Sequence, residues 1–105
     1  MNRFFYKWLK ETNYFIKLGD VIVVTDVFSK THYYTVIPKS DSYMIYELSI
    51  DGAAWVEAGL YKSLFDINKS IYKNTLLDNY ISDYDIIKIV SENNIKTELS
   101  AFLNN

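Results

Sequence analysis

The chain has little of the side-chain chemistry that most enzymes use. Its 105 residues contain no cysteine, one proline and one histidine, His32, and Arg3 is the single arginine. The absence of cysteine excludes disulfides and cysteine-ligated metals. Histidine, cysteine and arginine carry most nucleophilic, proton-transfer and phosphate chemistry, and here they are almost missing. We therefore expect a protein that binds another molecule, not an enzyme, and we expect no cofactor and no bound metal.

Long apolar runs and dense basic patches are also missing. No stretch approaches the roughly 18 apolar residues that span a bilayer. Met1 to Lys10 lacks the continuous apolar segment and the cleavage site of a signal peptide. These absences predict a cytoplasmic protein with no membrane partner. The net charge is −2, with +3 in residues 1–19 and −4 in residues 20–58. This distribution disfavours binding to nucleic acid.

Aromatic residues are abundant. Ten Tyr, six Phe and two Trp are present, and half of all residues are apolar. Such a composition is typical of a folded chain, and 105 residues suit one domain, 1–105, with a single core. Asn, Ile, Lys, Tyr and Phe make up 47 residues, and their AT-rich codons indicate a low-GC bacterium or its phage, with phage or chromosomal origin left open.

The first half of the chain predicts a helix followed by strands. In residues 3–12, Phe4, Phe5, Trp8 and Leu9 share one helical face, which would be either core or, if exposed, a docking face or homodimer seam. Residues 20–58 predict a β-meander of four strands. The strands expected there are 20–28, 32–37 (ended by Pro38), 43–50 and 53–58, with the last two joined by an Asp51-Gly52 hairpin turn.

The second half predicts a helix, a strand and an ambiguous tail. Gly59 is expected to end the meander, and Ser63 with Asp66 forms a capping-box pattern that begins a helix over 63–76. A loop over 78–83 and a strand over 84–90 follow. Residues 95–103 fit either a helix or a strand, with the helix favoured. The fold class is therefore α+β: a curved antiparallel sheet or small open barrel of about five strands, with N-terminal, middle and C-terminal helices packed on it.

Two segments resemble a known group of proteins. Lys17–Val24 (KLGDVIVV) followed by a Tyr-rich strand, and Leu60–Asp66 (LYKSLFD), resemble segments of small SH3-like barrel proteins from low-GC bacteria and their phages. The likeness covers residues 17–90 and names no specific family. The chain has Phe-Asp-Ile where that group usually has Glu-Glu-Leu. The resemblance implies an SH3-like fold neighbourhood and carries over no functional residue.

His32 and an acidic loop are the candidates for chemistry. His32 begins a strand, and Asp26 or Asp20 could orient it as a general base, although an ordinary structural histidine fits the pattern better. Asp78, Asp83 and Asp85 could hold a hard cation, but they lack the spacing of a calcium loop and are better interpreted as a solvated loop. A further hypothesis is that this loop mimics phosphate and occupies the basic site of a partner protein.

Tyrosines supply the candidate binding surface. Because side chains alternate along a strand, one of Tyr33 and Tyr34 must point outward, and Tyr43 or Tyr46 must do the same. Exposed Tyr is a preferred contact residue of protein interfaces. The predicted protein-binding residues are Tyr33, Tyr34, Tyr43, Asp78, Asp83 and Asp85. Stacking on single-stranded bases and purely structural tyrosines are the alternatives.

These patterns predict a small non-catalytic protein-binding inhibitor that acts by occlusion. The expected setting is a phage or mobile element that blocks a bacterial defence nuclease, as anti-CRISPR proteins do. One alternative is an immunity protein that neutralises a toxin nuclease through an acidic, aromatic surface. The other is a small enzyme that uses His32 and an Asp.

Overall fold

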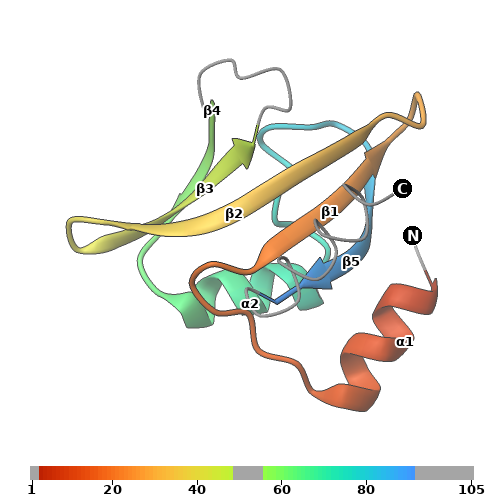
Figure 1. Ribbon diagram of the computed structural model, residues 1–105, viewed down its shortest axis with the longest axis horizontal. Coiled ribbons are helices and arrows are strands. Elements are labelled where there is room, and N and C mark those ends of the chain that lie inside the picture. Colours follow the sequence, from red (N-terminus) through yellow and green to blue (C-terminus); the bar gives the residue numbers. More distant parts are fainter. Residues whose placement is uncertain (1–2, 49–55, 92–105) are drawn as a thin grey trace, which may run out of the picture.

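The structure is a computed structural model that describes residues 3–48 and 56–91. These residues form a five-stranded antiparallel sheet and two helices, an α+β arrangement (Figure 1). The predicted segment at 95–103 and the Asp51-Gly52 turn lie outside the described residues. The elements are α1 (Arg3–Thr12), β1 (Val21–Asp26), β2 (Thr31–Lys39), β3 (Ser42–Leu48), β4 (Val56–Tyr61), α2 (Leu64–Tyr72) and β5 (Tyr84–Val90).

The strand order is β4-β3-β2-β1-β5, and every neighbouring pair is antiparallel. The first four strands are neighbours in chain order, as a meander requires. β5 returns to the far side of β1, where Val21 pairs with Val90 and Asp26 with Tyr84. The sheet is open, with β4 and β5 as its edges.

α1 has the bounds that the sequence predicts, but its buried face differs. The helix ends where Asn13 adopts a left-handed conformation with φ of 52°, which asparagine tolerates better than most residues. Phe5, Tyr6 and Leu9 are buried, whereas Phe4 is exposed. The predicted face containing Phe4 is therefore wrong by part of a turn, because the helix packs beside β5 and turns its Phe5–Leu9 side toward the core.

α2 begins as predicted and ends early. Ser63 is the N-cap, and its Oγ accepts a hydrogen bond of 3.1 Å from the amide of Asp66. The helix stops at Tyr72, not at residue 76. Asn74 has φ of 56°, a left-handed conformation that cannot continue an α-helix. Leu76 and Leu77 follow it in an irregular segment. Both are buried, although they are not part of a helix.

Pro38 does not end β2, contrary to the prediction. The strand continues to Lys39, and Pro38 pairs with Tyr43 of β3. The Gly19 amide donates to the Val36 carbonyl, so the main chain of Val36 faces the β1 side. Two residues on, Pro38 faces the same side, beyond the start of β1, where a missing N–H breaks no ladder.

Gly59 lies inside β4, although the sequence predicts that it ends the meander. Residues 53–55 of the predicted strand 53–58 lie outside the described residues, and β4 runs from Val56 to Tyr61. The register against β3 shifts so that Gly59 opposes Ile45 and Glu57 opposes Tyr46, which leaves Ala58 as the extra residue of a bulge. A Cβ on Gly59 would stand 3.3 Å from Cε2 of Tyr61. Gly59 therefore permits a close approach within the strand.

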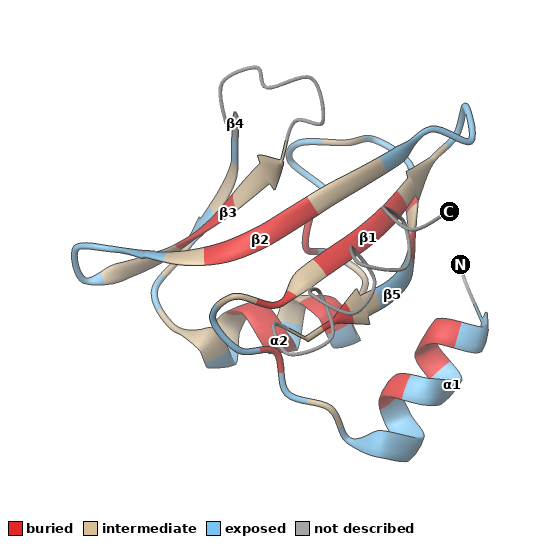
Figure 2. Ribbon diagram, viewed as in Figure 1, coloured by how far each residue is buried: buried red, intermediate tan, exposed pale blue. Residues whose placement is uncertain are grey.

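The core lies between the sheet and the two helices, with α1 beside β5 and α2 toward β4 (Figures 1 and 2). Burial concentrates in the middle of β1 and β2 and on the inner sides of the helices (Figure 2). One cluster joins all of these elements. Its members include Phe5, Leu9, Ile22, Val24, Tyr34, Val36, Ile45, Ile67, Ile71, Tyr84 and Ile86.

Candidate functional site

The turn between β1 and β2, residues 27–30, projects from the body of the protein (Figure 1). Asp26 organises it. One carboxylate oxygen, Oδ1, accepts hydrogen bonds from the amides of Phe28 and Lys30, each at 2.9 Å. The Asp26 amide donates to the Lys30 carbonyl, and the Ser29 amide donates to the Asp26 carbonyl. These four bonds hold Ser29 in a left-handed conformation with φ of 63°.

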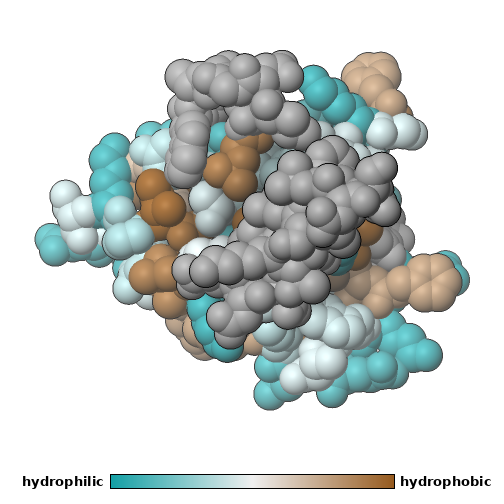
Figure 3. Space-filling view, viewed as in Figure 1, coloured by the Kyte–Doolittle hydropathy of each residue, from teal (hydrophilic) through white to brown (hydrophobic). Residues whose placement is uncertain are grey.

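Two apolar side chains stand at this turn. Val27 is 64% exposed and Phe28 is 87% exposed. In the space-filling view, the end of the turn carries apolar surface that stands out from the body of the molecule (Figure 3). Because the backbone beneath these side chains is fixed by hydrogen bonds, the turn presents them in a defined position.

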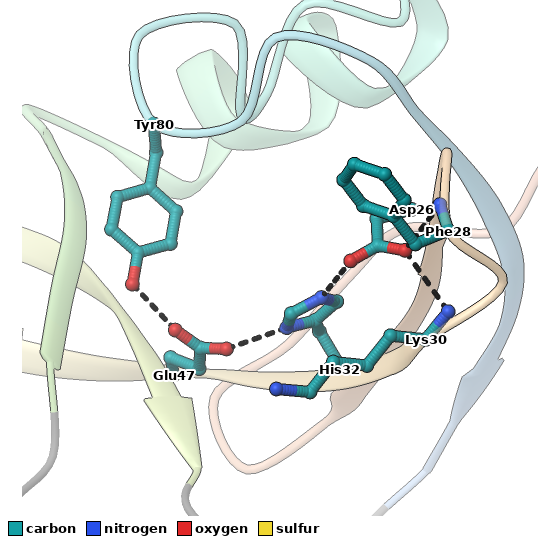
Figure 4. Close-up of polar contacts among 6 residues, drawn as sticks. All are labelled: Asp26, Phe28, Lys30, His32, Glu47 and Tyr80. Atoms are coloured by element: carbon teal, nitrogen blue, oxygen red, sulfur yellow. Dashed lines mark hydrogen bonds and ion pairs between the residues drawn. The ribbon is translucent and has the colours of Figure 1, made fainter.

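The second carboxylate oxygen of Asp26 leads to a polar network (Figure 4). Asp26 Oδ2 lies 2.8 Å from His32 Nε2, and Glu47 Oε1 lies 2.7 Å from His32 Nδ1. The Tyr80 hydroxyl donates to the other oxygen of Glu47. We call Asp26, His32, Glu47 and Tyr80 the His32 network. It joins β1, β2, β3 and the segment between α2 and β5.

The His32 network is half-buried and packs against aromatic rings. The side chains of His32 and Asp26 are each 15% exposed. The His32 ring stacks on Tyr34 at 6.4 Å between centroids, and Tyr34 meets the Tyr80 ring edge-on at 6.2 Å. Tyr34 itself is fully buried. The aromatic rings limit the access of water to the imidazole and strengthen its electrostatic contacts.

These contacts determine the protonation of the network. Burial is the largest single influence on His32 and lowers its pKa, but the hydrogen bonds and charges of Asp26 and Glu47 together raise it above the ordinary 6.5. The hydrogen bond with His32 is the main cause that lowers the pKa of Asp26. Burial raises the pKa of Glu47, but the bonds from Tyr80 and His32 outweigh it and the net shift is downward. Burial and Glu47 raise the pKa of Tyr80 to about 12.

The arrangement favours an imidazolium that links two carboxylates. In the prediction, Asp26 or Asp20 could orient His32. Asp26 does contact it, whereas Asp20 is buried elsewhere and accepts from the Tyr14 hydroxyl and the Lys17 amide. Both imidazole nitrogens are engaged by carboxylates, so in this geometry neither is presented to a substrate. The chemistry that the network supports is charge pairing and positioning.

The structure separates the predicted tyrosines. Tyr34 lies in the core, so it cannot contribute to a surface; the helical layer covers the face of β2 that carries it. Tyr33 therefore points to the opposite face and is half-buried. Tyr43 is half-buried and packs against the core cluster. The three do not form one exposed row.

Two of the three predicted acidic residues, Asp83 and Asp85, lie at the end of the sheet that carries the β1–β2 turn. Asp85 is half-buried and pairs with Thr25 in the sheet, and Asp83 is exposed just before β5 begins. Asp78 is exposed and accepts a hydrogen bond of 3.4 Å from the Tyr84 hydroxyl. Since Tyr84 pairs with Asp26, the start of β5 lies beside the end of β1. The register thus brings Asp83 and Asp85 to the same end of the sheet as Phe28.

Sequence reasoning missed Phe28, Glu47 and Tyr80. An apolar Val27-Phe28 pair directly before a polar Ser-Lys-Thr turn is a signal that was available for Phe28. Glu47 and Tyr80 carry no local signal, because they reach His32 only through strand pairing and the path of the chain after α2.

A second surface feature is an apolar groove of about 310 Å³ between α1 and β5, lined by Phe4, Phe5, Trp8, Ile87, Lys88 and Ile89.

In residues 3–48 and 56–91, no helix is long and apolar enough to cross a membrane, and no three His, Asp or Glu side chains are grouped to hold a metal ion. Comparison of the chain with protein-family models, with curated proteins and with solved structures finds no match.

Proposed function

We propose that this chain is a small, non-catalytic, cytoplasmic protein-binding module that acts by covering a surface of a partner protein. The observation that carries the proposal is the β1–β2 turn, which holds Phe28 in the solvent on a backbone fixed by Asp26. Large aromatic anchors contribute a disproportionate share of the energy of protein interfaces. An anchor whose backbone is already ordered loses less conformational entropy on binding than a mobile one.

The surroundings of the turn supply the second part of the argument. Asp83, which is exposed, and Asp85, which is half-buried, lie at the same end of the sheet as the turn. A partner with a basic surface around an apolar pocket would complement this combination of charge and aromatic area. Basic clefts are typical of nucleases, since these enzymes bind phosphate backbones.

This chemistry fits two biological settings, of which we favour the first. The chain would be a phage or mobile-element inhibitor that blocks a bacterial defence nuclease, in the manner of anti-CRISPR proteins. The second candidate is an immunity protein for a toxin nuclease, which needs the same surface and differs only in its partner. Size, acidity and the AT-rich composition support both.

A small enzyme that uses His32 and Asp26 is the alternative of a different class. The 2.8 Å contact between Asp26 and His32 favours it, because a carboxylate that orients an imidazole is a common catalytic pair. The second carboxylate, Glu47, argues for the binding proposal, since it occupies the nitrogen that a base would use. Loss of all activity in a folded His32→Ala variant that still binds the partner would favour the enzyme.

The experiment compares two exposed phenylalanines. Phe28→Ala and Phe65→Ala each remove one ring, and Phe65 is 66% exposed on α2, away from the turn. Binding of each variant to a panel of purified defence nucleases and toxin nucleases from low-GC bacteria is measured by calorimetry. We expect Phe28→Ala to weaken the complex by about 2 kcal/mol or more, roughly 30-fold, and Phe65→Ala to leave it unchanged.

Equal affinity of Phe28→Ala and the wild type for a partner would overturn the assignment of the turn. A double Tyr33→Ala, Tyr43→Ala variant extends the same test to the tyrosines predicted from the sequence. Because both are half-buried, its folding is checked by circular dichroism before binding is measured. A loss of affinity confined to this double variant would move the interface from the turn to the body of the sheet.

A further inference from the structure

His32 occupies a position that a neutral imidazole cannot satisfy. Each ring nitrogen lies within 2.8 Å of a carboxylate oxygen, one from Asp26 and one from Glu47. A neutral imidazole has one N–H and one lone pair, so one of the two carboxylates would face the lone pair. The imidazolium has two N–H donors and satisfies both. The geometry alone therefore calls for the charged form.

The same carboxylate holds His32 and the turn. Asp26 Oδ2 contacts the imidazole, while Oδ1 accepts from the amides of Phe28 and Lys30. The orientation of this carboxylate thus depends on the imidazolium, and the conformation of the turn depends on the carboxylate. Glu47 extends the connection, because its two oxygens join His32 of β2 to Tyr80 in the segment before β5.

We propose that the His32 network is a pH-sensitive fastening: the imidazolium locks the β1–β2 turn to the body of the sheet, and release of its proton loosens the turn and weakens partner binding. The part of this inference that concerns the partner rests on the proposed function. The part that concerns the turn does not, and it is measurable on the protein alone.

The charged and titratable groups around His32 lie on β1, β2, β3 and the segment before β5. Asp26 of β1 and Glu47 of β3 contact the ring, Tyr34 of β2 stacks beneath it, and Tyr80 closes the far side through Glu47. The ammonium of Lys30 acts on Glu47 and lowers its pKa. Around the imidazolium the two carboxylates are the anions in direct contact, so its proton is held beyond the ordinary pKa of 6.5.

The chain itself provides a direct probe, because His32 is its one histidine. In a ¹H NMR titration, the one imidazole Hε1 resonance reports the midpoint, because there is no second histidine to distinguish it from. We expect this midpoint to lie above 6.5, the ordinary value. Glu47→Gln removes one charge but keeps an oxygen for hydrogen bonding, so it should lower the midpoint. Glu57→Gln, an exposed position on β4, is the matched control and should not.

Amide hydrogen exchange then tests the turn. The Phe28 and Lys30 amides donate to the Asp26 carboxylate, and the Asp66 amide donates to Ser63 Oγ at the start of α2, outside the network. We expect the protection of the Phe28 and Lys30 amides against exchange to fall by about tenfold, relative to that of the Asp66 amide, as pH rises through the His32 midpoint. Parallel behaviour of all three amides through the midpoint would overturn the proposal.

The effect on partner binding is tested with the complex whose affinity depends on Phe28. Affinity is measured on both sides of the His32 midpoint for the wild type and for His32→Gln, which cannot carry the charge. We expect the wild type to lose about tenfold in affinity across the midpoint and the variant to show no such step. An identical step in both proteins would overturn the regulatory claim.

The two proposals fail in different ways. If the turn amides follow the His32 midpoint but no complex depends on Phe28, the proposed function is wrong and the fastening of the turn stands. If Phe28 is needed for binding but neither the amides nor the affinity respond at the midpoint, the function stands and the pH-sensitive fastening is wrong.

Discussion

The side chain of Asn68 pairs with the main chain of Ile16, a residue 52 positions earlier in the sequence. The Ile16 amide donates to Asn68 Oδ1 at 2.6 Å, and Asn68 Nδ2 donates back to the Ile16 carbonyl at 3.3 Å. A third bond joins Asn68 Nδ2 to the Leu64 carbonyl within α2. Ile16 lies in the linker between α1 and β1, outside any helix or strand. The buried side chain of Asn68 supplies the hydrogen bonds that a neighbouring strand or helical turn would otherwise give to its main chain.

Truncation of Asn68 should be strongly destabilising. Asn68→Ala leaves the amide and the carbonyl of Ile16 without partners in the core, and each buried unsatisfied group costs about 1–3 kcal/mol. We expect a loss of about 3 kcal/mol in the free energy of unfolding, measured by urea denaturation. Asn79→Ala, at an exposed position, is the control and should change stability by less than about 0.5 kcal/mol. Equal effects of the two substitutions would contradict this role for Asn68.

Stability should depend on pH through the His32 network. The folded-state pKa of His32 is raised above 6.5, so its stabilisation is complete below that value and is lost as pH rises through the folded-state pKa. The pKa values of Asp26 and Glu47 are lowered from 3.8 and 4.5, so their stabilisation is complete above those values and is lost as pH falls.

The contribution of the network is therefore greatest between the ordinary pKa of Glu47, 4.5, and that of His32, 6.5. We expect the urea midpoint of the wild type to decline on both sides of this window. His32→Gln should remove most of the decline on the alkaline side. A wild-type midpoint that rises steadily through the His32 titration would show that the sign is wrong.

Glu47 should control the ionisation of Tyr80. Burial is the largest cause that raises the pKa of Tyr80 to about 12, and the hydrogen bond and charge of Glu47 add to it. We expect Glu47→Gln to lower this pKa, because the tyrosinate would no longer face an anion. ¹³C-tyrosine NMR measures it, with Tyr80→Phe assigning the resonance. Tyr14, whose pKa is raised to about 12 by burial and by Asp20, is an internal reference that should not move.

The N-cap of α2 gives a prediction that rests on local structure. Ser63→Ala removes the acceptor of the Asp66 amide and should cost about 1 kcal/mol of stability. Ser63→Asp keeps an acceptor at the same place and should retain nearly all of it. Chemical denaturation of both variants compares them directly, and equal losses in the two would show that the cap contributes little.

Local patterns predicted the elements whose ends are determined by nearby residues. α1 occupies 3–12 and β5 occupies 84–90, as the periodicity of their apolar residues indicates. Ser63 caps α2, as the S-x-x-D pattern predicts. The interaction that begins α2, from the Asp66 amide to Ser63 Oγ, spans three positions in the sequence. α2 ends early because Asn74 takes a left-handed conformation, which the sequence permits but does not require.

The sheet registers lay beyond local patterns. Gly59 was expected to end a strand, but it pairs with Ile45 inside β4, next to the bulge at Ala58. Pro38 was expected to end another, but it faces a side of β2 where β1 has not yet begun. A strand accepts glycine or proline where the neighbouring strand leaves room, and the position of that neighbour is a tertiary property.

The sequence by itself determined an α+β chain with few catalytic residues, many aromatic ones and alternating strands. It could not choose between Tyr33 and Tyr34, because alternation defines two faces of a strand and not which of them a helix covers. Only the tertiary structure decided that Tyr34 is buried, and only it joined Asp26, His32, Glu47 and Tyr80 into one network. The physical reason is that these contacts link residues on separate elements, whose approach depends on the packing of the whole core.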